Sequence, residues 1–399
     1  MSTPPRAAGA SDGSRPILFL TVFIHLLGFG IIIPLLPYYA ETYGASGLTV
    51  GLLTTSFSLM QFLFAPLWGR LSDRIGRRPV LIGSLLVTGV SYVAFATAGS
   101  LLMLFASRML AGAAGAVIST AQAYVADTTS QAERTKGMGL IGAAFGMGFI
   151  FGPAIGGSLS HWGFAAPAYA AAALASIAAV FAYFRLRESL PREVRAQRAA
   201  RPHLPGVTML GVLRRPRIGP VLVTFFVATL CFAGMEAVLA LFCERTYGLG
   251  PSHIGYLLAY VGIVAATLQA GFVGKLAKRF GERTLARAGL VMIGAGFVAS
   301  GLAPPFAIFL VAMGAVAVGS GLSNPSLSGL VSIATPPEEQ GGILGFYQSL
   351  GSLGRAVGPF LGGLTFDHLG PGAPLWLAGA VLGGLVLYAA RLPARERAG

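Results

Sequence analysis

GLIGAAFGMGFIFGPAIGG, residues 139–157, is long and apolar enough to cross a bilayer, yet it contains seven glycines and one proline. Glycine surface gains nothing against lipid, whereas small residues between helices let two backbones approach closely. Pro153 removes one backbone hydrogen bond, which is tolerated in a membrane only where neighbouring helices satisfy the freed groups. This stretch therefore predicts a membrane-spanning helix that packs against protein.

The composition points to the same class of protein for the whole chain. Hydrophobic residues make up 55% of the 399 residues and charged residues 11%, and the mean hydropathy is +0.73. These values exclude a water-soluble globule. Apolar runs of the length that spans about 30 Å of hydrocarbon lie near residues 17–39, 49–68, 79–98, 101–125, 137–160, 165–184, 219–243, 253–273, 285–302, 306–330, 341–363 and 373–391. We predict an all-α membrane protein with twelve transmembrane helices.

The net charge of the chain is +14, and its positive residues are concentrated in the terminal segments and in alternate loops. All but three of the 28 Lys and Arg residues lie in, or within three residues of, the two terminal segments or the loops after predicted helices 2, 4, 6 and 8; the exceptions are Arg108, Arg245 and Arg355. This positive-inside pattern predicts a cell (inner) membrane protein with both termini in the cytoplasm. Because the arginines are spread over many short loops, we expect a lipid bilayer and no nucleic acid as their partner.

The predicted helices fall into two halves with one long connection. We expect a cytoplasmic tail at 1–16, a six-helix bundle at 17–184, a basic linker at 185–217, a second six-helix bundle at 218–391 and a tail at 392–399. The linker contains nine arginines and four prolines and little that is apolar. The polar start of the chain leads straight into the first apolar run, so no cleaved signal peptide is predicted.

The two halves repeat one another. The spacing of the opening stretch recurs with a constant offset of 206 residues, which pairs Gly139, Gly148, Gly152, Pro153, Gly156 and Gly157 with Gly345, Gly354, Gly358, Pro359, Gly362 and Gly363. A second echo joins GRLSDRIGRR at 69–78 with GKLAKRFGER at 274–283. Two pseudo-symmetric bundles are typical of secondary transporters, whose substrate site lies near the membrane midplane between the repeats.

Several motifs resemble those of the major facilitator superfamily. The loop between predicted helices 2 and 3 matches its loop motif at Gly69, Leu71, Asp73, Arg74, Gly76, Arg77 and Arg78. Predicted helix 4 is similar to a second motif at Leu104, Arg108, Gly112, Gly115 and Ala116. The glycine–proline run of predicted helix 5 resembles a signature of antiporters, and GFGIIIPLLP at 28–37 resembles helix 1 of drug:proton antiporters of the tetracycline-efflux type. The resemblance implies the major facilitator fold and proton-coupled drug efflux.

Asp73 has two interpretations. It lies among four arginines, so it forms either a surface ion pair of little energetic weight or a conformational latch. In the second case its carboxylate stabilises the positive end of a helix in the other half, and the resemblance places that helix start near Gly341 and Gly342. The second copy of the motif carries Lys278 instead, so one such latch is expected.

Three charged residues inside predicted helices are candidates for chemistry, because a charge within the membrane is costly unless it faces a partner or a cavity. Burial favours the neutral form of a carboxyl group, which suits Glu236 to bind and release a proton. Alternatively, Glu236 pairs permanently with Arg355 or reaches the outer interface. Arg108 either extends to the interface or lines the cavity and tunes a carboxylate. Arg355 is expected to be a charge partner or a substrate contact.

His25 is a fourth candidate for proton coupling, because histidine titrates near physiological pH. A packing role is the alternative. The resemblance to tetracycline-efflux proteins implies an acidic residue at this position. Because the chain has a histidine instead, the resemblance does not establish tetracycline as the substrate.

Other polar and aromatic residues inside helices are expected either to line an apolar cavity or to join helices by hydrogen bonds. They are Gln61, Gln122, Tyr124, Phe232, Tyr260, Gln269, Asn324, Tyr347 and Gln348.

The sequence shows no nucleotide-binding loop, no metal-ligand cluster and no nucleophile–base arrangement. We therefore expect neither an enzyme nor a cofactor, but a monomeric secondary transporter that exports amphipathic small molecules in exchange for protons. A uniporter or proton symporter of an organic anion or metabolite is the main alternative. A membrane receptor without transport is a remote one, because no soluble sensory domain is predicted.

Overall fold

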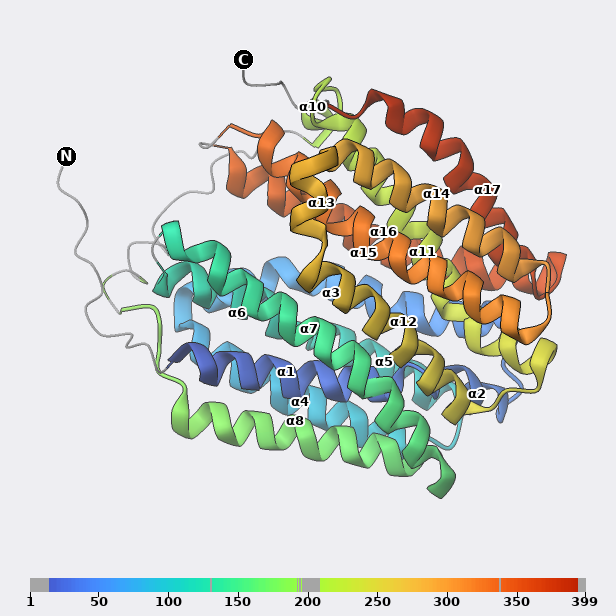
Figure 1. Cartoon of the computed structure of the whole chain (residues 1–399). Coiled ribbons are helices and arrows are strands. Elements are labelled where there is room, and N and C mark those ends of the chain that lie inside the picture. The colour runs from blue at the N-terminus through green and yellow to red at the C-terminus, as the bar shows by residue number, and fades with distance from the viewer. Residues whose placement is uncertain are drawn as a thin grey trace, which may run out of the picture. The chain divides into compact units, whose positions relative to one another are not determined.

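The computed structural model of the chain is shown in Figure 1, and it describes residues 14–129, 131–191, 193, 195, 209–336 and 339–393. Within these ranges the chain forms helices joined by short turns, and no β-strand occurs. Ten of the described helical segments are long and apolar enough to cross a membrane. The prediction of an all-α membrane protein is confirmed.

The chain divides into two compact units. Unit 1 comprises Met1–Leu35 and Met60–Pro202, and unit 2 comprises Leu36–Leu59 and His203–Gly399. Residues 36–59 belong to the first half of the sequence but cluster with the helices of the second. Helix α3 (Gly47–Ile75) therefore contributes its first part to unit 2 and its remainder to unit 1.

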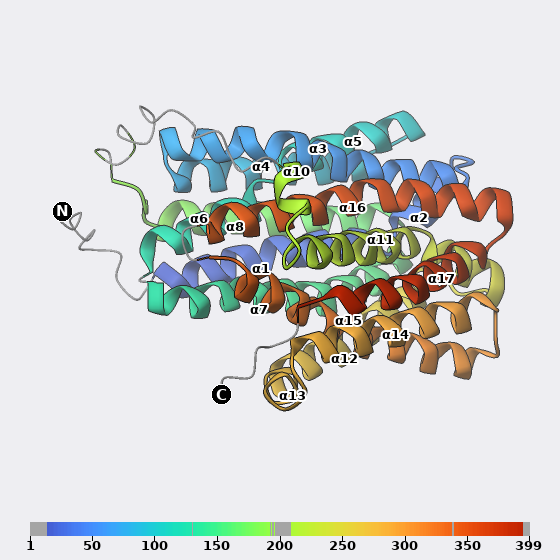
Figure 2. The ribbon, with the colours of Figure 1, turned by 90° about the horizontal axis from the view of Figure 1, so that it is seen from above.

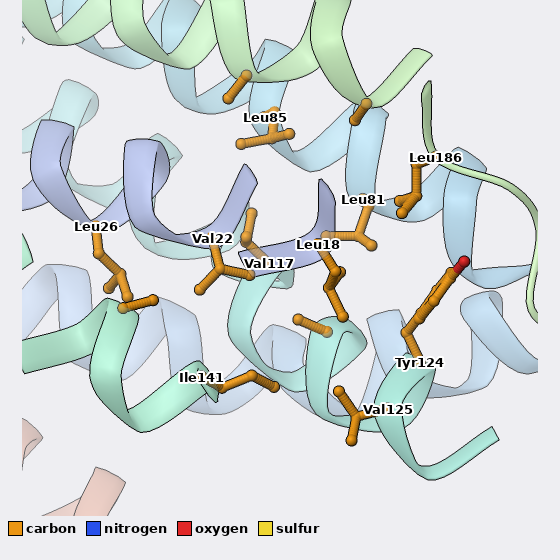
Figure 3. Packing of buried hydrophobic residues seen from close by; sticks show 14 of the residues in the cluster. Leu18, Val22, Leu26, Leu81, Leu85, Val117, Tyr124, Val125, Ile141 and Leu186 are labelled. Atoms are coloured by element: carbon orange, nitrogen blue, oxygen red, sulfur yellow. The ribbon is translucent and has the colours of Figure 1, made fainter. Parts of the chain in front are cut away.

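The helices of unit 1, besides the second part of α3, are α1 (Ser14–Ile32), α4 (Arg77–Ala96), α5 (Leu101–Ala113), α6 (Val117–Thr128), α7 (Gln131–Leu159), the short 3-10 helix η1 (Ser160–Trp162) and α8 (Ala165–Arg185). Helix α1 packs between α7 and α8, and α4 also packs against α8 (Figure 1). Fully buried apolar side chains of α1, α4, α6 and α7 meet in a common core, which includes Leu18, Val22, Leu81, Val117 and Ile141 (Figure 3).

Unit 2 contains α2 (Leu36–Glu41), the first part of α3, α10 (Met209–Leu213), α11 (Gly219–Tyr247), α12 (Pro251–Gly271), α13 (Val273–Phe280), α14 (Glu282–Gly301), α15 (Phe306–Ala334), α16 (Gln340–Leu369), α17 (Ala373–Tyr388) and the 3-10 helix η2 (Ala389–Arg391). Helix α11 runs alongside α16 and α17, and α14 packs against both α15 and α17 (Figure 2).

Two predicted helices are interrupted. The apolar run 17–39 ends as a helix at Ile32 and resumes as α2 after a turn that contains Pro34, because proline cannot donate the helical hydrogen bond. The run 101–125 divides into α5 and α6. Its break lies where the carbonyl groups of Ala113 and Ala114 accept hydrogen bonds from the side chains of Trp68 and Ser84.

The glycine-rich stretch at 139–157 lies in α7, which packs on α1. A Cβ atom added at Gly148, Gly152 or Gly156 would come within 3.0 Å of the α1 backbone or of Leu26, so only glycine permits this approach. The repeat of this stretch lies in α16, where added Cβ atoms at Gly358 and Gly362 would meet the backbone of α11 in the same way. Each copy therefore joins its helix tightly to another helix of the same unit.

The loop motif is also duplicated in structure. Gly76 precedes α4 with φ +111°, and Gly281 precedes α14 with φ +81°. L-amino acids rarely adopt this region of backbone conformation, so both copies of the turn require glycine.

Candidate functional site

Helices α11 and α16 bring the two predicted charges of unit 2 together. Their close approach depends on Gly354 and Gly358, which face the backbone of Leu230. On this scaffold Glu236 is half-buried and Arg355 is exposed. Each charge acts electrostatically on the other, but no direct ion pair joins them in the described part of the chain. Both groups can therefore take another partner.

Aromatic side chains lie beside the Arg355 guanidinium. The rings of Phe225 and Tyr347 stack with centroids 3.7 Å apart and an interplanar angle of 15°. A Cβ added at Gly351 would lie 2.9 Å from the Phe225 ring and 3.4 Å from Arg355 Nη1. The ring and the guanidinium group therefore both lie next to Gly351. Arg355 Nη2 donates a hydrogen bond of 3.3 Å to Ser352 Oγ. An apolar aromatic surface next to a cation suits an amphipathic ligand.

The polar residues of α16 form a stripe on one face. Gln348, Ser352 and Arg355 are spaced by four and three residues, which places them above one another on a helix. Gln348 and Arg355 are exposed. Exposed polar groups deep in an apolar helix are costly in lipid, so this face is suited to line a water-filled passage.

The remaining predicted contacts of unit 2 come from α11, α12 and α15. Gln269 of α12 and Asn324 of α15 are exposed, whereas Phe232 of α11 is half-buried with its ring 6.3 Å from that of Phe297. Tyr260 of α12 is 39% exposed, and it lines a shallow apolar groove with aromatic neighbours such as Tyr256 and Phe306.

In unit 1, Arg108 is buried and its guanidinium lies over the rings of Phe95, at 5.0 Å, and Tyr92, at 5.9 Å. His25 is half-buried, and its Nδ1 atom is fully covered without a hydrogen-bond partner in the described chain. Arg108 therefore lies against two aromatic rings of α4.

The other unit 1 candidates occupy three different environments. Gln61 packs against Gly115, where a Cβ would lie 2.9 Å from it. Gln122 is half-buried. Tyr124 belongs to the apolar core shown in Figure 3, and its hydroxyl group donates a hydrogen bond of 2.8 Å to the carbonyl oxygen of Arg187.

The loop motif builds a charge network around Arg77, which is 5% exposed. Its Nη2 donates to Asp73 Oδ1 at 2.6 Å and its Nε donates to Asp127 Oδ2 at 3.0 Å. Nη1 donates to Ser72 Oγ. Asp73 is therefore held by an arginine of its own motif, whereas Arg74 is exposed.

Two acidic residues that the sequence did not single out also take part in contacts. Glu188 accepts hydrogen bonds from the backbone N–H groups of Arg77, at 2.8 Å, and Arg78, at 3.2 Å, and so caps α4. Glu41 lies 3.6 Å from Arg245. Arg245 lies beyond the predicted run 219–243, but α11 continues to Tyr247 and includes it in its last turn.

No group of three or more His, Cys, Asp or Glu side chains that could hold a metal ion occurs among the described residues.

Comparison with known proteins adds to this geometry. The chain matches the Major Facilitator Superfamily over residues 18–284 and 268–399. It is 33% identical to multidrug resistance protein 2 of Bacillus subtilis (strain 168), with 92% of each chain covered. It is 34% identical to the class C tetracycline resistance protein of Escherichia coli, with 97% of each covered. Among solved structures it resembles the human organic anion transporter MFSD10 (TETRAN), with a TM-score of 0.73 and 25% identity over 97% of this chain and 100% of that one.

Proposed function

Because the chain belongs to the Major Facilitator Superfamily, we propose that this multi-pass transporter exports amphipathic small molecules in exchange for protons. The similarity to multidrug and tetracycline resistance proteins over more than nine-tenths of the chain supports efflux. The positive-inside pattern supports a location in the inner membrane with both termini in the cytoplasm. We further propose that the protein works as a monomer, with the two sequence halves rocking about a central site.

The pair of Glu236 and Arg355 carries this proposal. The Glu236 carboxyl group and the Arg355 guanidinium group interact electrostatically within unit 2 without a direct ion pair, and the stacked rings of Phe225 and Tyr347 lie beside the arginine. In an exchange mechanism the proton and the substrate compete for one carboxylate. Glu236 releases its proton toward the cytoplasm when substrate arrives and is protonated again from outside after the substrate leaves. Arg355 stabilises the charged form of Glu236 between these steps.

The other charged candidates support this cycle. Arg108 and His25 are proposed to act in unit 1 on the path of the proton or substrate, and Gln348, Asn324 and Gln269 are proposed to bind polar groups of the substrate. Tyr124 is a core residue, so we propose no substrate contact for it.

We propose that Asp73 releases Arg77 and stabilises the start of α16 when the cytoplasmic side closes. The positions expected to receive it, Gly341 and Gly342, lie outside the residues whose surroundings the structure describes.

Symport of an organic anion with protons is a second candidate. The exposed Arg355 guanidinium donates only one described hydrogen bond, so it can receive an anionic group. The solved relative MFSD10 is an organic anion transporter. In that case the anion and ionised Glu236 would compete for Arg355, and substrate binding would favour proton uptake rather than release.

The direction of proton-driven flux distinguishes the two candidates. The purified protein in proteoliposomes would be offered tetracycline, the cationic dye ethidium and the anionic dye carboxyfluorescein under pH gradients of both signs. Antiport predicts that substrate accumulates in the more acidic compartment, and symport predicts accumulation in the more alkaline one. A flux that ignores the pH gradient for every transported substrate would contradict proton coupling.

A further inference from the structure

Residues 36–59 are bound to α11 and α16 by several contacts between distant parts of the sequence. Within unit 2, the hydroxyl group of Tyr38 lies within hydrogen-bond distance of the carbonyl oxygens of Ala240 in α11, at 3.4 Å, and of Leu249 just after α11, at 2.7 Å. Thr55 donates a hydrogen bond of 2.8 Å to the carbonyl oxygen of Ala356 in α16. These contacts hold α2 and the first part of α3 to the second half of the chain.

The contact at the start of α3 is electrostatic. Asp367, in the last turn of α16, accepts the backbone N–H of Gly47 on Oδ1 and that of Leu48 on Oδ2, both at 2.8 Å. The first N–H groups of a helix have no partner within the helix, and together they carry a partial positive charge. The Asp367 carboxylate therefore satisfies two donors at once and neutralises this end of the helix. The cap comes from a residue 320 positions away in the sequence.

Glycines on both helices make this reach possible. A Cβ at Gly47 would lie 2.6 Å from the Phe366 ring and 2.7 Å from Asp367 Oδ1. A Cβ at Gly51 would meet the carbonyl group of Pro359, and one at Gly363 would meet the carbonyl group of Gly47. The backbones of α3 and α16 therefore touch along two turns, and the carboxylate cap closes the end of this contact.

The two helices run antiparallel in a regular register. Gly47 contacts Asp367 and Gly363, Gly51 contacts Pro359 and Gly363, and Thr55 contacts Ala356. Asp73 follows Gly47 by the same number of residues as Gly341 precedes Asp367. If α3 and α16 packed in this register at their other ends, Asp73 would reach the first turn of α16.

Helix α3 is continuous across the boundary of the two units, since it leaves unit 2 at Leu59 and enters unit 1 at Met60. If the units move relative to one another, the first part of α3 must separate from α16 or the helix must bend. The bonds to Asp367 lie where that separation would begin.

We propose that Asp367 is an outer latch, a positioning residue that holds the non-cytoplasmic face closed by capping α3. This inference rests on the proposed alternation of the transporter and on its predicted orientation. Asp367 is the counterpart of the latch proposed for Asp73: Asp367, near the end of α16, caps the start of α3, and Asp73, near the end of α3, is proposed to cap the start of α16 in another state. The outer latch is made in the structure described above and breaks when the outer face opens.

The test is a distance measurement across the outer face. Spin labels at Thr97, after α4, and Leu302, after α14, are exposed and report opening by double electron–electron resonance, with buried Cys231 and Cys243 replaced by alanine. Asp367→Asn removes the charge, and we expect about a tenfold rise in the ratio of outer-open to outer-closed molecules, as for a lost charged cap. Asp367→Glu retains the charge and should restore most of the closed population.

The adjacent exposed residue supplies the control, since His368→Asn changes the same turn of α16 and should leave the distances unchanged. An unaltered distance distribution in folded, monodisperse Asp367→Asn protein would overturn the latch. A shift of equal size in His368→Asn would overturn it too, because the effect would then belong to the turn and not to the cap. This readout needs neither a substrate nor a proton gradient, so a failure of proton coupling leaves it unaffected.

Discussion

Arg355 shows why exposure and position together point to function. Arg355 is exposed on α16, within the run 341–363 that is predicted to span the membrane, and its one described hydrogen bond goes to Ser352 in the same helix. Such a residue contributes little to packing, whereas a charge at that depth is costly unless it serves a partner.

We predict that Arg355→Ala lowers transport at least tenfold and changes the free energy of unfolding by less than about 1 kcal/mol. Initial rates of substrate counterflow in proteoliposomes and thermal unfolding in detergent measure the two effects. Ser349→Ala is a neutral control, because the described hydrogen bond of this α16 residue goes to the carbonyl oxygen of Gly345 in its own helix. Wild-type counterflow in Arg355→Ala would remove this residue from the site, and a large loss of stability would make it structural instead.

Sequence reasoning found Glu236 and Arg355 because a charge inside an apolar run is visible in the sequence. It missed Asp367, in the last turn of α16, and Glu188, three residues after the end of α8, because nothing local in the sequence shows what these acidic residues contact. Each caps a helix through backbone N–H groups from a distant part of the chain. No local pattern records such a pairing.

At the scale of the element, the glycines of α7 divide into those that touch another helix and those that do not. An added Cβ at Gly156 would collide with the backbone at Ile31, whereas at Gly146 it would meet nothing within 4 Å. Both lie in the same long helix, so they form a matched pair.

We predict that Gly156→Ala destabilises the protein by about 1–3 kcal/mol, because α1 and α7 must separate to admit the methyl group. Gly146→Ala should be neutral or stabilising by up to about 1 kcal/mol, because alanine favours a helix over glycine. Thermal unfolding of the two variants in the same detergent gives the comparison. Equal melting temperatures would show that the α1–α7 contact is looser than described.

The helices themselves were largely predictable from hydropathy, since each of the twelve apolar runs is helical over most of its length. The interruption after α1 has a local cause in Pro34. The break between α5 and α6 does not, because Trp68 and Ser84 reach the carbonyl groups of Ala113 and Ala114 from other helices.

At the scale of the whole molecule, the internal duplication explains the recurrence of one helix pair in each unit. The pairs α1–α7 and α11–α16 are both joined through glycines at equivalent positions of the repeat. The second copy carries Arg355 where the first carries Phe149. The duplication therefore provides the scaffold, and its asymmetry locates the proposed chemistry in unit 2.

The division into units was less predictable than the repeat. Residues 36–59 cluster with the second half because α3 begins under the Asp367 cap, and this packing depends on glycines of α16 such as Gly363. The same spacing of glycines is compatible with packing on either neighbour, so the sequence alone does not select one.

The most direct test of proton coupling at Glu236 compares gradient-driven uptake with exchange at equal pH in proteoliposomes of Glu236→Gln. We predict that this variant loses uptake driven by a pH gradient but retains substrate exchange. A transporter with glutamine at this position can still alternate between its two states, but glutamine cannot carry a proton. Glu282→Gln, the same change at the start of α14, should retain both activities. Full gradient-driven uptake in Glu236→Gln would contradict the account.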